Sequence, residues 1–233
     1  MAYACRKRGT RLIVYAATTA NAYKVERMRA LGAEVILFGE DFDASKEHAK
    51  QVAREQGYIM IEDALTVETV EGAGTIGLEL TNAGEFNVLL IALGNGALFN
   101  GVSTVYKSLR PKTKRIAVQA EGAPAMAESW KSGMLVSYPH IHTIADGIGV
   151  RLPIQEAVND MRSLADDVIT VREHSIIEAM NLLHEHAGIV VEPSGAVGIA
   201  AILEDRPRFE GMRVATIICG GNLTESQRKA WLK

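Results

Sequence analysis

The amino-acid sequence predicts an α/β fold built on parallel sheets, and two observations carry that prediction. Short runs of β-branched and other apolar residues alternate along the chain with longer stretches whose apolar residues repeat at helical spacing. One run, at residues 87–93, is continuously apolar after its first residue, which is typical of a strand buried on both faces of a parallel sheet. With 233 residues, 48% hydrophobic and 23% charged, the chain can form one large or two modest domains with a substantial core.

The first part of the chain is expected to contain two strand–helix units and a third short strand. The expected elements are a strand at 11–17, a helix at 21–31, a strand at 33–38, a helix at 43–56 and a short strand at 58–62. Gly32 and Gly57 stand where the two helices are expected to end, as glycine often does. Residues 63–70 are expected to connect this part to a glycine-rich helical stretch beginning at Glu71, so the sequence indicates a domain boundary near residue 70.

The second part of the chain repeats the alternation of strands and helices. The expected elements are a strand at 87–93, a helix at 98–109, a strand at 114–120, a helix at 124–132, a loop at 143–150, a helix at 153–164, a strand at 167–171, helices at 175–186 and 194–203, and a core strand at 214–221 that runs into glycines.

Composition and charge exclude several classes of function. The formal net charge of -3 and the sequence pI near 6.1 provide no basic stripe, so neither nucleic acid nor membrane is expected as a partner. No run of about 18 apolar residues occurs, and the N-terminus does not resemble a signal peptide. Cys5 and Cys219 lie far apart in sequence, which argues against a disulfide framework or a zinc site and favours a reducing, cytoplasmic setting.

The loop Gly94-Asn95-Gly96-Ala97, between the apolar strand and the next helix, is predicted to hold a phosphate group. Gly94 and Gly96 permit close approach of a ligand, and the unpaired amides at the start of the helix favour an anion. A tight turn without a ligand is the alternative. A dinucleotide is disfavoured because the glycines at 94, 96 and 101 do not follow the G-x-G-x-x-G spacing, although Gln119 and Glu121 end the next strand. A small phosphorylated cofactor is therefore the expected ligand of this loop.

Five motifs, taken in their order along the chain, resemble a known family. They are GTIGLE at 74–79, GNGAL at 94–98, TIADGI at 143–148, VVEPSGA at 190–196 and CGGN at 219–222. This set is similar to the serine and threonine dehydratases of the tryptophan-synthase-β-like, pyridoxal-phosphate-dependent superfamily (fold type II), and the resemblance covers essentially the whole chain. It implies two three-layer α/β domains with parallel or mixed sheets, the first domain and part of the second being missing at the N-terminus. Residues 1–70 would be a remnant of the small domain and residues 71–233 the large, cofactor-binding domain.

The resemblance also implies roles for individual residues. The residues expected to contact pyridoxal 5'-phosphate are Gly94, Asn95, Gly96, Ala97, Leu98, Gly147, Glu192, Cys219 and Gly220. The backbone amides of Gly94 to Ala97 would hold the phosphate, Gly147 and Glu192 would line the ring, and Cys219 would face the pyridine nitrogen. Relatives usually carry glycine where Asn95 and Ala97 stand, but both residues still offer an amide, and Asn95 can add a side-chain hydrogen bond. A neutral thiol facing the nitrogen would leave it unprotonated, which suits elimination better than transamination. Two plainer alternatives are that Glu192 only caps the following helix and that Cys219 is a buried strand-end cysteine.

No metal site is expected. Some members of the family bind a cation through a glutamate that Glu121 matches, but Met126 and Ala127 stand where an accompanying aspartate would fall, which disfavours a tight divalent site. A monovalent ion held by carbonyl groups remains open. We assign no role to His140 and His142.

The chain is expected to lack the catalytic residue of the family. Covalent chemistry with this cofactor needs a lysine that forms a Schiff base and moves the α-proton. The resemblance places that lysine, and the turn that grips the substrate carboxylate, before Met1, and it matches Lys24 to a different, peripheral lysine. We therefore expect an N-terminal truncation, caused by an internal valine codon taken as a start or by a broken gene, and poor solubility of the chain alone.

The resemblance predicts a lyase of amino-acid metabolism. The expected reaction is the β-elimination that converts L-threonine or L-serine to a 2-oxo acid and ammonia, carried out by a homodimer acting on a small amino acid. Racemase, threonine synthase and sulfhydrylase activities are alternatives within the superfamily. A catalytically dead cofactor-binding or interaction module is the alternative of a different class.

Overall fold

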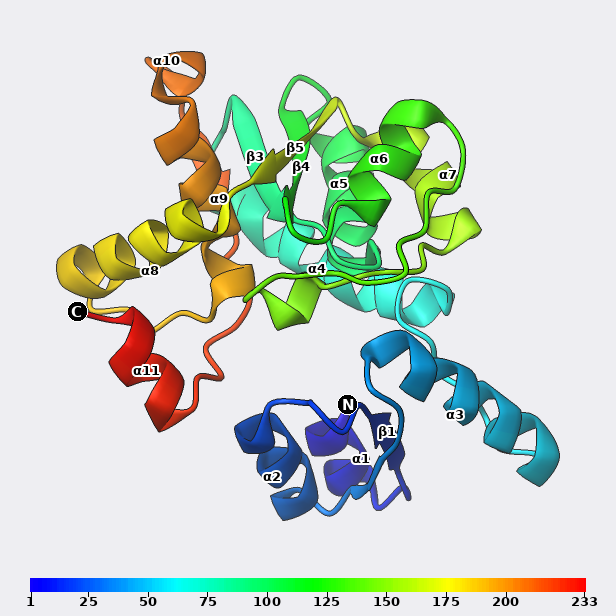
Figure 1. Ribbon diagram of the computed structural model, residues 1–233. Coiled ribbons are helices and arrows are strands. Elements are labelled where there is room, and N and C mark those ends of the chain that lie inside the picture. The colour runs from blue at the N-terminus through cyan, green and yellow to red at the C-terminus, as the bar shows by residue number, and fades with distance from the viewer. The chain divides into compact units, whose positions relative to one another are not determined.

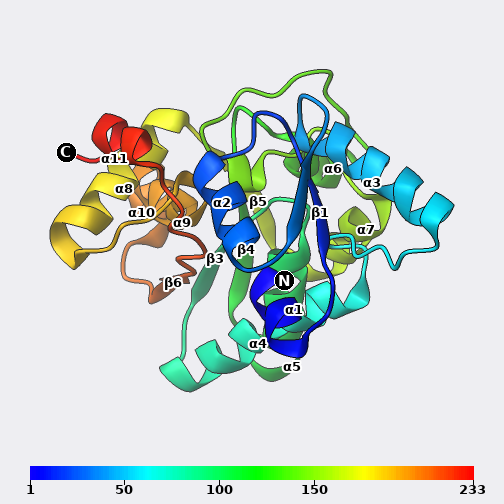
Figure 2. The ribbon, with the colours of Figure 1, turned by 90° about the horizontal axis from the view of Figure 1, so that it is seen from below.

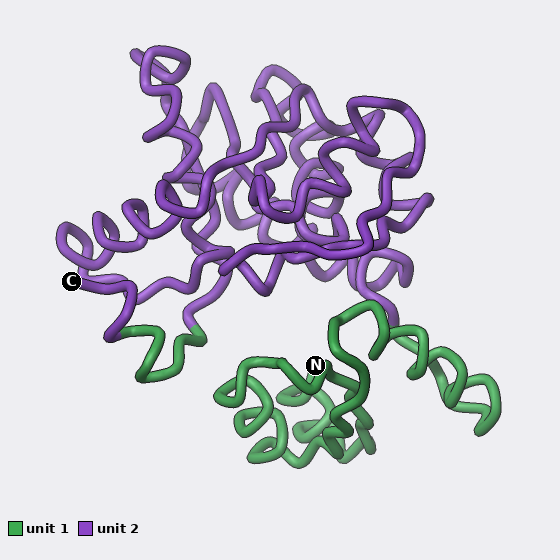
Figure 3. The backbone as a smooth tube through the Cα atoms, viewed as in Figure 1, with its two compact units in different colours: residues 1–61, 222–228 green, residues 62–221, 229–233 purple.

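The computed structural model describes residues 1–233 and divides into two compact units (Figure 3). The first comprises Met1–Ile61 and Asn222–Arg228, and the second Glu62–Gly221 and Lys229–Lys233. The division falls before residue 70, where the sequence analysis places a domain boundary. At this point Glu62 N donates a 2.9 Å hydrogen bond to Oγ1 of Thr66, the residue before the following helix.

The first unit is a small α/β unit with a two-stranded parallel sheet. Its elements are α1 (Ala2–Arg8), β1 (Ile13–Ala16), α2 (Ala22–Ala30), β2 (Glu34–Leu37), α3 (Phe42–Gln56) and the start of α11 (Glu225–Trp231). Strand β1 pairs with β2 in a register that matches Ile13 with Glu34. The side chains of Asn21 and Asp41 accept backbone hydrogen bonds at the starts of α2 and α3, which explains where these helices begin.

The strand expected at residues 58–62 is not present, so that prediction was wrong. Strands β1 and β2 pair only with each other, and residues 58–62 follow α3 as an irregular segment. The side chain of Ile59 is 93% exposed. An apolar run forms a strand only where a neighbouring strand can take up its backbone hydrogen bonds.

The second unit carries the larger sheet and most of the helices (Figure 1). Its elements are α4 (Val67–Ala83), β3 (Val88–Ala92), α5 (Ala97–Leu109), β4 (Lys114–Ala120), α6 (Ala125–Ser132), the 3-10 helix η1 (Asp146–Ile148), α7 (Gln155–Leu164), β5 (Asp167–Val171), α8 (Glu173–Ala187), α9 (Pro193–Glu204), α10 (Arg206–Phe209) and β6 (Val214–Thr216). Helix α4 starts at Val67, within the stretch expected to be a connection, and the short helices α1, α10 and α11 were not expected from the sequence.

All strand pairs of the second unit are parallel, in the order β5-β4-β3-β6. Figures 1 and 2 show α5, α6 and α7 on one side of this sheet and α8 and α9 on the other. Every residue of β3 is buried, as its apolar sequence predicts. The predicted α/β class with parallel sheets is confirmed, and the carboxyl ends of β3 and β6 lead into the glycine-containing segments 94–97 and 217–221.

Strand β6 is shorter and more accessible than expected. It spans only Val214–Thr216, its residues are half-buried, and residues 217–221 continue as an irregular segment. The prediction of a core strand over 214–221 was therefore wrong beyond Thr216. The segment 217–221 lies beside the start of α9, where Glu192 N donates a 3.0 Å hydrogen bond to Gly220 O.

No helix of the structure combines the length and the apolar character that crossing a bilayer would require.

Candidate functional site

The loop Gly94-Asn95-Gly96-Ala97 connects β3 to α5 and leaves its backbone amides unpaired. Gly96 has φ +108°, a conformation that L side chains rarely adopt, and no side chain caps the start of α5. The amides of Gly94, Asn95 and Gly96 donate no hydrogen bond in the structure. Ala97 and the half-buried Leu98 belong to the first turn of α5, whose amides lack partners within the helix. Unpaired amides at a helix start form a site for an anion.

Asn95 adds a side-chain amide to this loop. The residue is 6% exposed, and its Oδ1 atom is buried without a hydrogen-bond partner. A buried polar atom without a partner is unusual and costs stability unless a ligand satisfies it. Rotation of the amide group brings the Nδ2 donor to the same place, so Asn95 can donate a hydrogen bond to an anion held by the loop.

Three glycines bring four segments of the second unit into close contact. A Cβ atom on Gly94 would lie 3.3 Å from Ile148 Cα, and one on Gly147 would lie 2.7 Å from Ser194 Oγ. A Cβ atom on Gly220 would lie 2.5 Å from Glu192 Cδ. The structure therefore gathers the loop 94–97, η1, the start of α9 and the segment after β6, all of which contain motifs named in the sequence analysis.

Glu192 stands immediately before α9, but its side chain makes no capping hydrogen bond. The carboxylate is 7% exposed and lies against Gly147 and Gly220. The structure thus contradicts the plainer interpretation that Glu192 serves only to cap the helix. Ser194, which the sequence analysis passed over, is 3% exposed and has an Oγ atom with no partner. Its place in the first turn of α9, two residues after Glu192, is the signal that could have identified it.

Cys219 lies beside the same helix start. Its Sγ atom is 3.8 Å from the carbonyl oxygen of Ser194, and the residue is exposed, so it is not a buried strand-end cysteine. Partial loss of hydrating water raises the pKa of the Cys219 thiol, and the negative charge of Glu192 raises that pKa further. The thiol is therefore neutral at neutral pH.

Comparison with known proteins identifies the family. The model of the family described as pyridoxal-phosphate dependent enzyme matches residues 1–220. The chain belongs to this family. It is 35% identical over 201 residues to an L-threonine ammonia-lyase of Thermotoga maritima, covering 86% of this chain and 50% of that protein. It is 30% identical over 234 residues to a serine racemase of Oryza sativa subsp. indica, covering 96% of this chain and 67% of that protein.

A solved structure shows the same fold. The structure of maize serine racemase superposes with a TM-score of 0.90 at 29% identity, over 98% of this chain and 71% of that one. The chain thus has the α/β fold of the tryptophan-synthase-β-like pyridoxal-phosphate enzymes, and it spans half the length of the Thermotoga relative. The family and its cofactor, which the five motifs predict, are confirmed, whereas the roles of the individual site residues stay predictions.

The second unit of this pyridoxal-phosphate-dependent family member offers groups that fit the cofactor. The unpaired backbone amides of residues 94–96 suit its phosphate. Asn95 Oδ1 and Ser194 Oγ are two further buried polar atoms that have no hydrogen-bond partner within the protein. No lysine lies among these residues. Lys24 belongs to α2 of the first unit, where it is half-buried.

The residues considered for a cation do not form a metal centre. Glu121 is exposed after β4, and Met126 and Ala127 are fully buried in α6. No three His, Cys, Asp or Glu side chains come close enough to share a metal ion.

Proposed function

We propose that the protein to which these residues belong is a pyridoxal-phosphate-dependent threonine or serine dehydratase, which converts L-threonine or L-serine to a 2-oxo acid and ammonia. The observation that carries this proposal is the position of the Cys219 thiol at the start of α9, beside Ser194 and Glu192, where desolvation raises the pKa of the thiol. The similarity to an L-threonine ammonia-lyase supports it. Because serine racemases are similarly close, racemisation of serine is the neighbouring alternative.

Each site residue has a role that follows from its chemistry. The amides of residues 94–98, together with Asn95, would hold the phosphate, while Gly147 leaves room for the ring and Glu192 borders it. Bound there, pyridoxal phosphate supplies an electron sink for the charge left when the substrate α-proton departs. The neutral Cys219 thiol cannot protonate a ring nitrogen as a carboxylic acid would, and a weaker sink favours loss of the β-hydroxyl over transamination.

Cofactor binding is tested with two substitutions at one position. Asn95→Asp places a negative charge in the loop and should weaken binding of pyridoxal phosphate by about tenfold or more, because like charges repel. Asn95→Gly removes the side chain but keeps the amide, so most of the affinity should remain. Titration followed by the cofactor's absorbance, with inorganic phosphate as competitor, measures both. Equal affinities for the unsubstituted and Asn95→Asp chains would refute the phosphate loop.

Activity is tested by measuring 2-oxo acid released from threonine and serine, with D-serine formation measured in the same samples. Release of 2-oxo acid as the main product supports the dehydratase. D-serine as the main product supports the racemase instead.

A second candidate is a cofactor-binding module without catalytic activity, and the absence of a lysine among the site residues favours it for residues 1–233. Treatment with borohydride after cofactor binding separates the two. A label that survives denaturation requires a covalent bond and supports the enzyme. Cofactor that is released on denaturation and displaced by phosphate supports the module.

We also propose a homodimer in the cytoplasm. Large apolar side chains on α4 and α5 are exposed, with Val67 61%, Leu78 50% and Leu109 48% accessible, and both cysteines are free. Sedimentation analysis should give twice the monomer mass. A monomer at micromolar concentration would contradict the dimer.

A further inference from the structure

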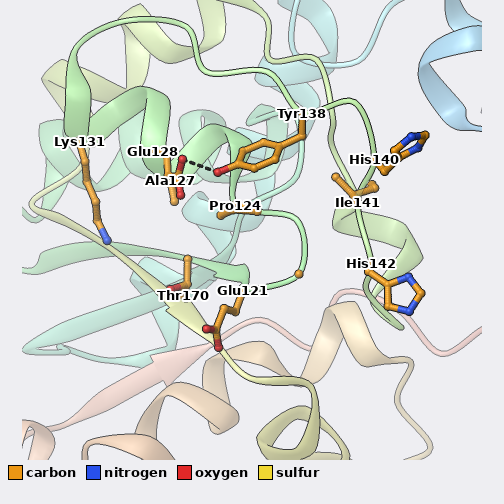
Figure 4. Close-up of a pocket in the computed structure, with 11 residues that line it drawn as sticks. Glu121, Pro124, Ala127, Glu128, Lys131, Tyr138, His140, Ile141, His142 and Thr170 are labelled. Carbon is orange, nitrogen blue, oxygen red and sulfur yellow. Dashed lines mark hydrogen bonds between the residues drawn. The ribbon is translucent and has the colours of Figure 1, made fainter.

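The second unit contains a cavity of about 700 Å³ that none of the proposed cofactor residues lines. Figure 4 shows it bounded by α6, by the end of β4, by Thr170 of β5 and by the segment 138–142. Its lining residues are Glu121, Gly122, Pro124, Ala127, Glu128, Lys131, Tyr138, His140, Ile141, His142 and Thr170. The sequence analysis assigned no role to His140, His142 or Lys131.

The sheet register explains why polar groups from two strands meet here. Gln119 of β4 pairs with Thr170 of β5, and Gln119 Oε1 accepts a 2.9 Å hydrogen bond from Ala127 N of α6. The Gln119 side chain therefore points to the α6 side of the sheet, and so does that of its neighbour Thr170. Glu121 directly follows the end of β4 and lines the same cavity. Lys131 stands one helical turn after Ala127 on α6.

Two opposite charges in this cavity are free to meet a ligand. Neither the Glu121 carboxylate nor the Lys131 ammonium group makes a hydrogen bond or ion pair in the structure. Figure 4 shows the Lys131 side chain extending from α6 toward Thr170 and Glu121. The other carboxylate is engaged, because Tyr138 donates a 2.5 Å hydrogen bond to Glu128 Oε2, which also raises the pKa of Tyr138.

The charged side chains of the cavity disfavour both a metal cation and a phosphate group as its ligand. A metal cation would meet the ammonium group of Lys131, and no three metal-ligating side chains come together. A phosphate group would meet the two carboxylates of Glu121 and Glu128 against a single ammonium. A molecule with a positive and a negative end satisfies both free charges, and the side chains of Pro124 and Ile141 supply apolar surface.

We propose that this cavity binds a free α-amino acid with an apolar side chain, whose ammonium group pairs with Glu121 and whose carboxylate pairs with Lys131. Thr170 can donate a hydrogen bond to the same carboxylate. This site is additional to the proposed cofactor site and does not depend on the proposed function.

The test is calorimetric titration of the 233-residue chain, without cofactor, with L-phenylalanine and L-leucine. Saturable binding is expected. N-acetyl-L-phenylalanine lacks the positive charge and 2-phenylethylamine lacks the negative one, so each should bind about tenfold more weakly or worse. Glu121→Gln and Lys131→Met should each weaken binding of L-phenylalanine by a similar factor.

Matched substitutions control for the change of net charge. Glu210→Gln and Lys112→Met alter exposed residues of the same unit outside the cavity and should leave the affinity unchanged. Glu121 and Lys131 are themselves exposed, so their variants should fold, which circular dichroism checks. The proposal is overturned if the amino acids do not bind, if either single-charged analogue binds equally well, or if both cavity variants keep the original affinity.

Discussion

Desolvation raises the pKa of Cys219, the Glu192 charge adds to that effect, and the contribution of Glu192 can be measured at the level of single residues. Because the carboxylate raises the pKa of the thiol, Glu192→Gln should lower that pKa, and the thiolate should form at lower pH. In a Cys5→Ser background, the pH profile of alkylation by iodoacetamide should shift toward lower pH. Glu210→Gln should leave the profile in place. An unshifted Glu192→Gln profile would mean that desolvation alone sets the pKa.

The ion pair of Arg115 with Asp166 should contribute more to stability than an exposed pair. Asp166 accepts hydrogen bonds from Arg115 N at 2.7 Å and Nε at 2.9 Å, and the Arg115 side chain is 9% exposed. Asp166→Ala leaves a buried guanidinium unpaired and should lower the free energy of unfolding by about 3 kcal/mol.

The comparison is Glu34→Ala, which removes the ion-pair partner of Arg11. Both side chains of that pair are exposed, Arg11 to 68% and Glu34 to 51%. It should cost clearly less stability than Asp166→Ala, because solvent screens both charges. Chemical denaturation measures both variants, and equal losses would contradict the difference.

At the same scale, the sequence identified some residues of the site and missed others for a physical reason. Gly94, Glu192 and Cys219 stand at conspicuous strand ends or helix starts, so their motifs reveal them. Lys131 lies in an ordinary helix and gains its proposed role only because Thr170 of β5 and Glu121, which follows β4, line the same cavity. Such a meeting depends on sheet register, which a single sequence does not display.

At the scale of elements, glycines allow α4 and α5 to pack closely. A Cβ atom on Gly101 would lie 2.3 Å from the carbonyl oxygen of Val70 and 2.7 Å from Gly74 N, both of them backbone atoms. Gly101→Ala must therefore push the helices apart, and it should lower the free energy of unfolding by about 2 kcal/mol or more.

Gly72→Ala is the matched control, because no atom lies within 4 Å of the added methyl group. On the exposed side of α4 it should raise stability by about 0.5–1 kcal/mol through its effect on helix propensity. Thermal unfolding should show shifts of opposite sign. Shifts of the same sign would contradict the packing argument.

Element boundaries followed from the sequence where local chemistry sets them. Strand β4 has the bounds that its apolar run predicts, and Asn21 and Asp41 stand at the helix starts. The predictions of a strand at residues 58–62 and of a strand over the whole of 214–221 were wrong, because a strand forms only where a neighbouring strand pairs with it. Residues 58–62 have no neighbouring strand, and β6 pairs with β3 only through Val214–Thr216.

At the scale of the whole molecule, the order of the motifs predicted more than any local pattern. The motifs at 94–98, 190–196 and 219–222 are remote in sequence, yet their segments, together with Gly147, come together beyond the carboxyl ends of parallel strands. Two of these segments follow parallel strands, 94–98 after β3 and 219–222 after β6, so both lie at the edge of the sheet where the strands end. The segment 190–196 and Gly147 follow helices, and their place is set by packing rather than by strand direction.

The two units should differ in local stability, because their sheets differ in burial. Every residue of β3 is buried and the strand has hydrogen-bonded neighbours on both sides, whereas no residue of β1 or β2 is buried. Opening the first sheet thus exposes less apolar surface. Native-state hydrogen exchange at Leu89–Ile91 should be slower than at Val14–Tyr15, on the order of 100-fold. Equal exchange rates would show that the first sheet opens only when the second one does, and that the two units unfold as one.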